Sequence, residues 1–546
     1  MHEEQPMNEF LDNAEFAIGV VEAVNGNSAT CALDGYIINL LRDHEDPSIA
    51  RCGAPGSILR MNVENQSLLA NLREIELNAH DELLLTAAID FLGAGDTTAE
   101  GIKHFRRGIT QYPRPGDKVY GVRSSLLADV FSTGDRPHIK VGTIYPTAET
   151  KASLLIDPML GMHFAILGST GTGKSTTAAL ILHQLIECSP HAHIVIMDPH
   201  GEYAKAFPTT GLTFDVENIK IPYWLLNFEE HCQVFIHGEG IEREINRDVL
   251  GKCLLAARSK TNLAANLGAI TVDSPLPYQL PDLLDALNQE MGKLEKASLV
   301  QHYNRLKISI EEKIRDPRFS FIFDRSLASA SLEEFLSRIL RLPAQGTPLA
   351  IIDLSGMPSE IIQTIVGLVA RVTLDFAMWS RDEVIHPILL VCEEAQRYLS
   401  ANPSASTDHV RHSLERIAKE GRKYGVSLGL VTQRPSELSE TALSQCGTYI
   451  TLRLNSEKDQ DRIRKTLPDS ARGFVDTISA LRNRECIISG EGVVVPVRVT
   501  LDYLEEARRP KSEDPSYTEA WKDSSEDRDW ISRSIQRWRR QGSRTS

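Results

Sequence analysis

A glycine-rich stretch that follows an apolar run carries the clearest chemical signal in the sequence. Residues 168–175, GSTGTGKS, match the G-x-x-x-x-G-K-[ST] pattern of a nucleotide phosphate loop. The glycines let backbone N–H groups turn toward a phosphate at the start of a helix, where the helix dipole also favours an anion. Lys174 is expected to reach the β- and γ-phosphates and the Ser175 hydroxyl to bind Mg²⁺. The nucleotide-binding set is predicted to be Gly168, Ser169, Thr170, Gly171, Thr172, Gly173, Lys174, Ser175 and Thr176.

Acidic residues follow three of the apolar, strand-like runs. Hydrolysis needs one acid to hold Mg²⁺ and another to orient the attacking water. The pair Glu393–Glu394 directly follows PILLVC, and the carboxyl ends of parallel strands face the ligand crevice. We therefore assign Glu393 to Mg²⁺ and Glu394 to the water, although one of them could simply begin the next helix. Asp198 and Asp353 each stand alone at a strand end, which is more typical of a helix cap or a loop anchor.

Polar residues of two further segments have more than one interpretation. VRHSLERIAKEGRKYG (410–425) has the periodicity of a helix, with Arg422 and Lys423 pointing away from its apolar face. Both residues are consistent with solvated surface charges. Gln433 follows the strand-like VSLGLVT, where an amide can sense a γ-phosphate or merely satisfy a turn. The residues alone do not decide between these roles.

The elements that must position these groups follow from the apolar pattern. After residue 160, the strand-like runs HFAIL, HIVIMD, PLAIIDLSG, PILLVCEEA and VSLGLVT are mostly separated by helix-like stretches. This alternation predicts an α/β domain with a parallel sheet covered on both faces. Residues 229–342 interrupt it with helical periodicity, which predicts an inserted helical subdomain. RECIISG (484–490) and VVVPVRVT (493–500) are the last predicted strands.

The N-terminal part of the chain has a different pattern. Residues 16–33 predict a β-hairpin that turns at Asn25-Gly26-Asn27. Residues 116–122 and 139–144 predict further short strands, whereas residues 66–109 look more helical. The first 150 or so residues are therefore expected to form a small β-rich domain with a helical insertion.

Composition limits the class of protein. A chain of 546 residues should form two or three domains, and 42% hydrophobic with 24% charged residues is typical of a soluble protein. No apolar run approaches the ~20 residues that span a bilayer, and the acidic N-terminus lacks the features of a signal peptide. The eight scattered cysteines fit reduced thiols in a cytoplasmic protein. The net charge of −15 argues against a broadly basic nucleic-acid-wrapping surface and leaves a local basic channel open.

Taken together, these segments resemble the HerA family of hexameric DNA translocases, within the HerA/FtsK group of P-loop ATPases. The resemblance extends from about residue 160 to residue 500, and its two longest segments are its most specific part. YPRPGDKVYGV and IKVGTI are similar to the N-terminal β-barrel of the family. Gln396 departs from the pattern, because the family often has His after Glu-Glu-Ala. The segments that carry the resemblance are GSTGTGKST, DPHGEY (198–203), IPYWLLNFEE (221–230), EEAQRYL (393–399), IAKEGRKYGVSLGLVTQRPSEL (417–438) and VVVPVRV.

The resemblance implies a domain order and a set of roles. It implies a β-barrel domain with a helical insertion over residues 1–150, a RecA-like P-loop ATPase domain over 151–500 with its helical insertion at about 229–342, and a C-terminal arm over 501–546. Lys174, Ser175, Glu393 and Glu394 would form the hydrolytic core, with Ser175 and Glu393 on the metal. Arg422 would be an arginine finger that acts on a neighbouring subunit, and Gln433 a sensor. Asp198 would belong to the second-strand motif of the family, and Asp353 has no assigned role.

The resemblance also implies cofactors and partners. We expect ATP and Mg²⁺, a homohexameric ring, and double- or single-stranded DNA in the ring pore, held mainly by phosphate contacts. An effector partner is expected: a NurA-type nuclease, another nuclease or a sirtuin-type NADase. The expected function is an ATP-driven DNA translocase or helicase in DNA end processing or anti-phage defence. The alternative is a hexameric scaffold and regulatory NTPase that controls a defence effector. A pump for conjugation or secretion is disfavoured, since no membrane segment is predicted.

The C-terminal tail resembles the family's subunit-lacing arm. Trp521, Trp530 and Trp538 stand in an otherwise polar segment, and large exposed apolar side chains favour docking onto another surface. The basic residues of the tail fit a solvated helix face better than a binding site for DNA or an effector. They are Arg533, Arg537, Arg539, Arg540 and Arg544.

Overall fold

The computed structural model describes residues 17–78, 84–98, 101–238, 240–292, 297–403, 408–511, 516–522 and 529–540. Contacts within the chain divide it into two compact units. The first comprises Met1–Cys188 and Gly429–Glu505, and the second comprises Ser189–Leu428 and Glu506–Ser546.

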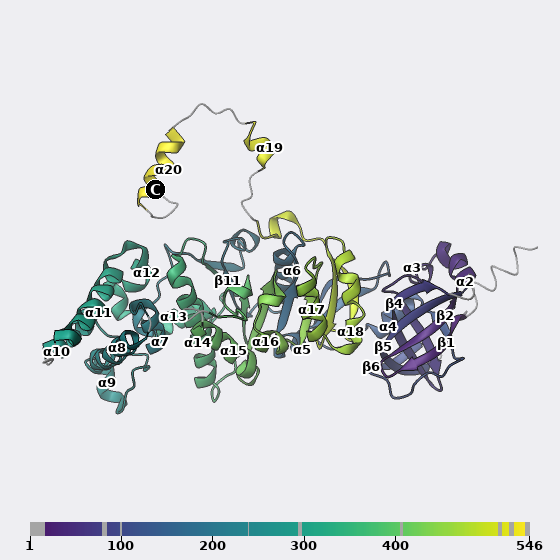
Figure 1. Ribbon diagram of the computed structural model, residues 1–546, viewed down its shortest axis with the longest axis horizontal. Helices are drawn as coiled ribbons and strands as arrows, with labels where there is room; N and C mark the ends of the chain where they lie inside the picture. Colours follow the sequence, from purple (N-terminus) through teal and green to yellow (C-terminus); the bar gives the residue numbers. More distant parts are fainter. Residues whose placement is uncertain are drawn as a thin grey trace, which may run out of the picture. The chain divides into compact units, whose positions relative to one another are not determined.

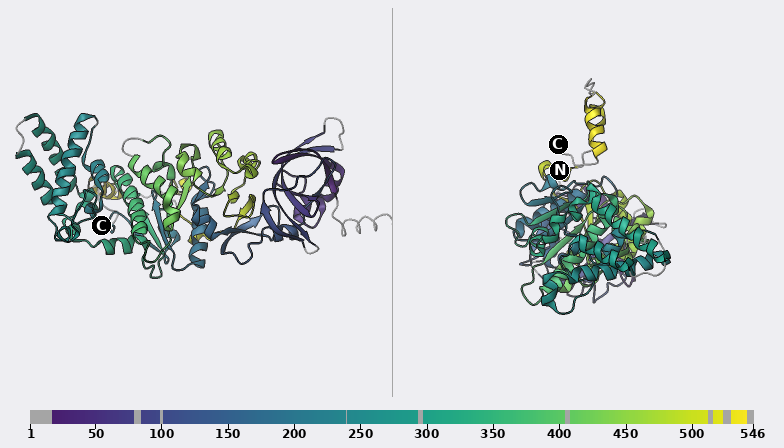
Figure 2. Two further views of the ribbon diagram at one scale, coloured as in Figure 1. Left: turned by 90° about the horizontal axis from the view of Figure 1, so that it is seen from below. Right: turned by 90° about the vertical axis from the view of Figure 1, so that its left-hand side faces the viewer.

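The first unit begins with a closed β-barrel (Figure 1), whose strands form a ring in the left-hand view of Figure 2. The strands pair in the order β2-β1-β7-β3-β4-β5, and β5 pairs with β2 to complete the ring. The turn between β1 and β2 confirms the predicted hairpin. Buried side chains such as Ile18, Leu59 and Met61 fill the core. The strands are β1 (Ala17–Asn25), β2 (Ser28–Asp34), β3 (Ile58–Val63), β4 (Gln66–Leu77), β5 (Leu84–Thr98), β6 (Gly101–Arg107) and β7 (Lys118–Gly121).

The predicted helical insertion at residues 66–109 is wrong, because this range forms β4, β5 and β6. Residues 67–72 are all buried, so β4 lacks the alternation that marks a half-exposed strand. The long strand β5 pairs with β4, β2 and β6. Tertiary pairing therefore overrides the helical propensity of its leucines and alanines. The short helices of the barrel region lie elsewhere, at α2 (Gly35–Leu40), α3 (Pro47–Ala50) and α4 (Ser124–Val130).

The rest of the first unit is built around β10 (Phe164–Leu167). This strand lies parallel to β15 (Val426–Thr432) on one side and to β16 (Thr448–Thr451) on the other. Antiparallel pairing continues from β16 through β17 (Glu485–Gly490), β18 (Val497–Leu501), β8 (His138–Ile144) and β9 (Lys151–Leu155). The helices of this part are α5 (Ile156–Gly161), α6 (Lys174–Cys188), α16 (Glu440–Ser444), α17 (Glu457–Thr466) and α18 (Asp469–Arg472).

Arg107 joins the barrel to this second part of the first unit. The Arg107 Nε atom of β6 donates to the Val494 carbonyl at 2.7 Å. Its Nη2 atom donates to the carbonyls of Gly490 and Val493. One guanidinium therefore satisfies the backbone of the turn between β17 and β18.

The second unit contains the parallel strands β11 (His193–Asp198), β12 (Gly211–Phe214), β13 (Leu349–Asp353) and β14 (Ile388–Cys392). They lie in the order β12-β13-β11-β14. Nearly all side chains of β11, β13 and β14 are buried, and this explains why these strands are unbroken apolar runs in the sequence. These strands and β10 and β15 confirm the predicted α/β fold with parallel strands. Two long helices, α14 (Ser359–Trp379) and α15 (Asp408–Glu420), belong to the same unit.

The helix α14 contradicts the expectation that no segment is long and apolar enough to span a bilayer. Among the described residues it is long and apolar enough, by length and composition, to cross a membrane. However, 67% of its apolar window is buried inside the protein. Side chains such as Ile365, Val366 and Leu368 are fully covered. The burial explains the apolar composition as that of a core helix.

The predicted helical subdomain is confirmed within the second unit (Figure 1). Arg258, only 1% exposed, holds two irregular segments of the subdomain together. Its guanidinium donates to the carbonyls of Trp224, Leu226, Val272 and Ser274. The helices are α7 (Phe228–Phe235), α8 (Ile241–Ser259), α9 (Asn262–Leu267), α10 (Leu280–Gly292), α11 (Ala297–Arg315), α12 (Ser320–Phe323) and α13 (Leu332–Leu340).

A buried ion pair joins the first helix of this subdomain to α14. Arg371 Nε and Nη2 each lie 2.9 Å from a carboxylate oxygen of Glu230, whose side chain is 2% exposed. Removing one partner would leave a buried charge uncompensated. We therefore expect Arg371→Ala to lower the free energy of unfolding by about 3–5 kcal/mol. Amide hydrogen exchange of α7 and α14 in urea measures this loss. The half-exposed pair Arg247–Glu229 is the control, and Arg247→Ala should cost at most about 1 kcal/mol. Equal losses of stability in the two variants would contradict the conclusion that the Arg371–Glu230 pair is a buried, stabilising ion pair.

The described part of the C-terminal tail forms two helices, α19 (Tyr517–Ala520) and α20 (Asp529–Arg540). Trp521, Trp530 and Trp538 are 82%, 54% and 78% exposed. The docking of this tail onto another surface stays a prediction. Arg533 and Arg539 are exposed, and Arg544 lies outside the described residues.

Candidate functional site

The phosphate loop lies between a strand and a helix, as predicted. β10 ends at Leu167, and α6 begins at Lys174. The loop is thus at the carboxyl end of a parallel strand and at the N-terminus of a helix, where backbone N–H groups favour an anion. Gly171 and Gly173 have φ values of +75° and +95°, in the left-handed region that favours glycine. The backbone conformation of the loop therefore explains why the sequence pattern has glycine at these two positions.

Ser169 organises the inside of this loop. Its carbonyl accepts hydrogen bonds from Thr172 Oγ1 at 2.7 Å and from Lys174 Nζ at 3.2 Å. Its hydroxyl oxygen accepts from the Asn455 N–H at 3.1 Å. Lys174 is only 7% exposed, so its ammonium group lies within the loop. The lysine is positioned beside the backbone that is expected to bind phosphates.

Gln433 reaches the phosphate loop directly. It follows the last residue of β15, which pairs with β10. The Thr170 hydroxyl donates a hydrogen bond to Gln433 Oε1. This contact favours a role at the nucleotide over a role confined to the turn after β15. The sensor function itself stays a prediction.

In the second unit, Asp198 anchors a loop. Its carboxylate is fully buried and accepts hydrogen bonds from the N–H groups of His200, Gly201 and Tyr203, at 3.2, 2.9 and 2.9 Å. Burial raises the pKa of Asp198 to about 6, although these hydrogen bonds oppose the rise. Asp353 accepts from the Ser355 N–H at 2.9 Å and so also serves its own loop. Each of the two isolated acids matches the loop-anchor interpretation.

Glu393 is held by a residue that the sequence did not single out. Its side chain is 3% exposed, and Oε2 accepts a hydrogen bond from Tyr203 Oη at 2.8 Å. Tyr203 is fully buried, and its own N–H is bound by Asp198. One acid therefore positions the tyrosine that donates to another. The only signal in the sequence was the position of Tyr203 at the end of DPHGEY.

Glu394 occupies an unusual backbone conformation directly after Glu393. Its φ is +51°, and it precedes a single 3₁₀ turn, Ala395–Arg397, rather than a long helix. Its side chain is largely buried, with the residue 8% exposed. Gln396 Nε2 donates a hydrogen bond to Glu394 Oε2. The two acidic neighbours thus have different partners, in agreement with two different roles.

Arg422 lies beyond the end of α15, so the predicted continuous helix over 410–425 is wrong. α15 ends at Glu420, and Gly421–Tyr424 form a 3₁₀ turn that Gly425 closes with φ +76°. A side chain at Gly421 would lie 2.6 Å from the Val426 carbonyl oxygen, which explains why glycine occupies this position.

The basic side chains of this region differ in their partners. In α15, Arg411, Arg416 and Lys419 pair with nearby acids. Arg422 and Lys423 are exposed, and neither side chain has a hydrogen bond or ion pair with the part of the chain that the structure describes. Such a cation is available to a group outside its own subunit.

The predicted site residues fall into two groups. The phosphate loop and Gln433 belong to the first unit, whereas Glu393, Glu394 and Arg422 belong to the second. Within the described ranges, no group of three or more His, Cys, Asp or Glu side chains gathers as a protein-only metal site. Mg²⁺ in nucleotide sites needs only one or two protein oxygens besides phosphates and waters. A hydroxyl and a carboxylate, those of Ser175 and Glu393, are the right kind of ligand for it.

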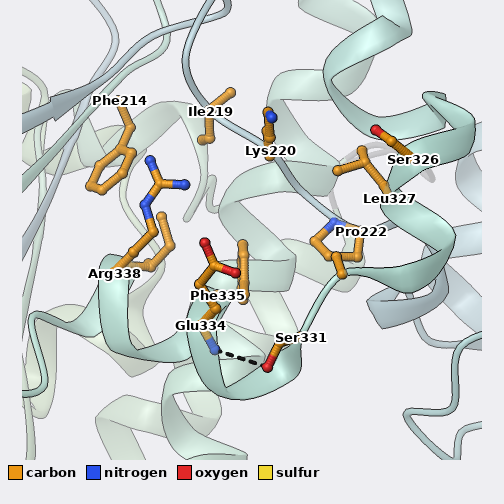
Figure 3. Close-up of a pocket in the computed structure, with 12 residues that line it drawn as sticks. Phe214, Ile219, Lys220, Pro222, Ser326, Leu327, Ser331, Glu334, Phe335 and Arg338 are labelled. Carbon is orange, nitrogen blue, oxygen red and sulfur yellow. Dashed lines mark hydrogen bonds between the residues drawn. The ribbon is translucent and has the colours of Figure 1, made fainter.

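A separate hollow of about 230 Å³ is lined by residues of β12, of α13 and of the segments next to them (Figure 3). Phe214, Ile219, Leu327 and Phe335 line it. The Arg338 guanidinium carbon lies 5.4 Å from the centre of the Phe214 ring. None of the predicted site residues lines this hollow.

Comparisons with known proteins show which family and which structures the chain is similar to. Residues 139–372 match the family model for the central domain of the helicase HerA. A probable helicase of Methanocaldococcus jannaschii is 28% identical over 460 residues, covering 80% of this chain and 84% of that protein. The DNA double-strand break repair helicase HerA of Pyrococcus furiosus is 28% identical over 437 residues, covering 72% and 74%. The solved structure of VirB4 of Thermoanaerobacter pseudethanolicus has a TM-score of 0.51 at 14% identity, covers 69% of this chain and 99% of its own, and shows a shared fold.

Proposed function

The chain belongs to the HerA family of P-loop ATPases, and from this premise we propose that it is an ATP-driven DNA translocase or helicase. One observation carries the proposal. The phosphate loop lies between a strand and a helix, and its Thr170 hydroxyl donates a hydrogen bond to Gln433, in a chain that is similar to HerA helicases over most of its length. ATP is the proposed nucleotide, and Mg²⁺ is the proposed metal ion.

Each site residue has a proposed task. The backbone of residues 168–175 and the Lys174 ammonium bind the phosphates, and Ser175 and Glu393 hold Mg²⁺. When bound, the metal ion neutralises charge that develops on the phosphates. The Glu394 carboxylate accepts a hydrogen bond from the attacking water and thereby orients it. Arg422 of a neighbouring subunit stabilises the charge of the transferred phosphoryl group, so that activity requires an oligomer, proposed to be a homohexameric ring.

The proposed substrate is double- or single-stranded DNA in the pore of this ring. Contacts to DNA phosphates would make binding independent of sequence and sensitive to salt. Because the chain carries a net charge of −15, these contacts are expected from a local basic surface only. A nuclease, NurA-type or other, or a sirtuin-type NADase is the proposed effector, in DNA end processing or anti-phage defence. A cytoplasmic location is part of this proposal.

An ATPase assay with and without DNA tests the proposed function. We expect DNA to stimulate hydrolysis by the purified protein, salt to reduce this stimulation, and Lys174→Ala to abolish activity. The assay is repeated with the product of the adjacent gene as a candidate effector. Two results together would favour the alternative, a scaffold and regulatory NTPase, over the motor. DNA would not stimulate hydrolysis, and the Lys174→Ala variant would still assemble with the effector.

Tyr203→Phe tests the proposed metal role of Glu393. Losing the buried hydroxyl removes a donor from Glu393 Oε2, and outer partners of metal ligands typically change affinity or activity about 10–100-fold. We therefore expect half-maximal ATPase activity to require at least about 10-fold more Mg²⁺. The control is Tyr398→Phe, because the equally buried Tyr398 Oη has no hydrogen bond within the described residues. A Mg²⁺ dependence that is the same in both variants would refute the role.

A further inference from the structure

An amide side chain binds the carboxylate that is proposed to orient water. Gln396 Nε2 donates to Glu394 Oε2, and the two residues are separated by Ala395 alone. A carboxylate has about four acceptor positions, so one amide donor can orient the group and leave it able to accept from water. An amide also does this without titrating. The contact therefore combines a fixed orientation with a retained acceptor.

The backbone around this contact is fixed by other bonds. The Arg397 N–H donates to the Glu394 carbonyl at 2.9 Å, and the Leu399 N–H donates to the Ala395 carbonyl at 2.9 Å. Gln363 Nε2 of α14 donates to the Arg397 carbonyl at 3.0 Å. Ala395, Tyr398 and Leu399 are fully buried. The turn thus has hydrogen bonds of its own besides the one from Gln396 to the Glu394 carboxylate.

The conformation of Glu394 points to a functional constraint. Its φ of +51° and ψ of +46° are costly for a residue other than glycine. Such conformations persist only where the surrounding structure enforces them, and they cluster at functional sites. Here the left-handed backbone sets the direction of the side chain from Cα, and Gln396 fixes its far end.

We propose that Gln396 is a positioning residue that holds the Glu394 carboxylate in the orientation required for the attacking water. The inference rests on the proposed function, since it names a partner of the proposed water-orienting group. A flexible glutamate would spend part of its time in unproductive orientations, and small misplacements of a catalytic group are costly in rate. Because Gln396 acts through Glu394, its loss should lower kcat and leave nucleotide binding unchanged.

The test compares substitutions of two glutamines whose amides donate to this turn, Gln396 on the turn itself and Gln363 on α14. Gln396→Met keeps the length of the side chain and removes the donor, whereas Gln396→His keeps an N–H donor. Gln363→Met is the matched control, because it removes an amide that binds backbone rather than Glu394. We expect Gln396→Met to lower kcat about 10-fold or more. KM and the Kd for a non-hydrolysable ATP analogue should not change. Gln396→His should stay within about 3-fold of the wild type, and Gln363→Met should keep the wild-type kcat.

A second comparison separates positioning from general loosening. In a Glu394→Gln background, Gln396→Met should have no further effect, since residues that act as one unit are not additive. A wild-type kcat in Gln396→Met would overturn the inference. So would equal losses in Gln396→Met and Gln363→Met, or full additivity with Glu394→Gln. Absence of ATP hydrolysis by the wild-type protein would instead reject the proposed function, and the inference with it.

Discussion

Glu394→Gln should bind ATP as tightly as the wild type and hydrolyse it at least about 100-fold more slowly. The substitution keeps the size of a side chain that is largely buried and lies next to Gln396. An amide oxygen can still accept the hydrogen bond from Gln396, so the turn should keep its geometry. What is lost is the negative charge that is proposed to orient the attacking water. Single-turnover hydrolysis and binding of a fluorescent ATP analogue measure the two properties separately.

Asp353→Asn is the matched control for this prediction. Asp353 also follows a buried strand, but its carboxylate accepts from the Ser355 N–H in its own loop. Its loss of charge should change kcat by less than a few fold. If the two variants slow hydrolysis equally, Glu394 has no special role. If Glu394→Gln fails to bind the nucleotide, its effect is structural.

Arg422→Ala should assemble normally and lose about 1,000-fold or more in kcat, the range measured for arginine fingers. Arg422 is exposed on a tight turn, and its guanidinium has no partner among the described residues of its own chain. It can therefore approach a neighbour without breaking an existing ion pair. Truncation removes the charge and disturbs no packing, so the loss should be confined to catalysis.

Mixing experiments decide whether this arginine acts between subunits. Adding Lys174→Ala subunits, which have an intact Arg422, to Arg422→Ala subunits should restore part of the activity. Native mass spectrometry confirms that mixed rings form. Lys423→Ala is the control, since Lys423 is also exposed and unpaired within the described residues and should be dispensable. Mixed rings without recovered activity at any ratio, or equal losses in both variants, would show that Arg422 is an ordinary surface charge.

Several parts of the fold could be predicted because their causes are local. The glycines of the phosphate loop are needed for the left-handed backbone at Gly171 and Gly173. The strands β10, β11, β13, β14 and β15 are buried along their length, and this gives the apolar runs their continuity. The helices α8, α10 and α13 bury residues at the spacing of one helix face. In each case, neighbouring residues carry the whole signal.

Prediction failed where a distant segment changes the meaning of the local pattern. Residues 66–109 look helical by local pattern, but β5 pairs with β2 to close the barrel, and residues 89–93 of β5 are buried without a break. The helix α14 has an apolar composition because the protein covers it. The helix before Arg422 ends at Glu420, and the Val426 carbonyl oxygen leaves no room for a side chain at Gly421.

The sequence by itself therefore determined the phosphate loop, the α/β class and the presence of a helical subdomain, since glycine conformation and apolar periodicity are local properties. Only the tertiary structure decided which polar groups touch. Tyr203 reaches Glu393, and Thr170 reaches Gln433, across long stretches of chain. Hydrogen bonds require placement within a few tenths of an ångström, and packing of whole strands and helices sets that placement. No spacing in the sequence encodes it.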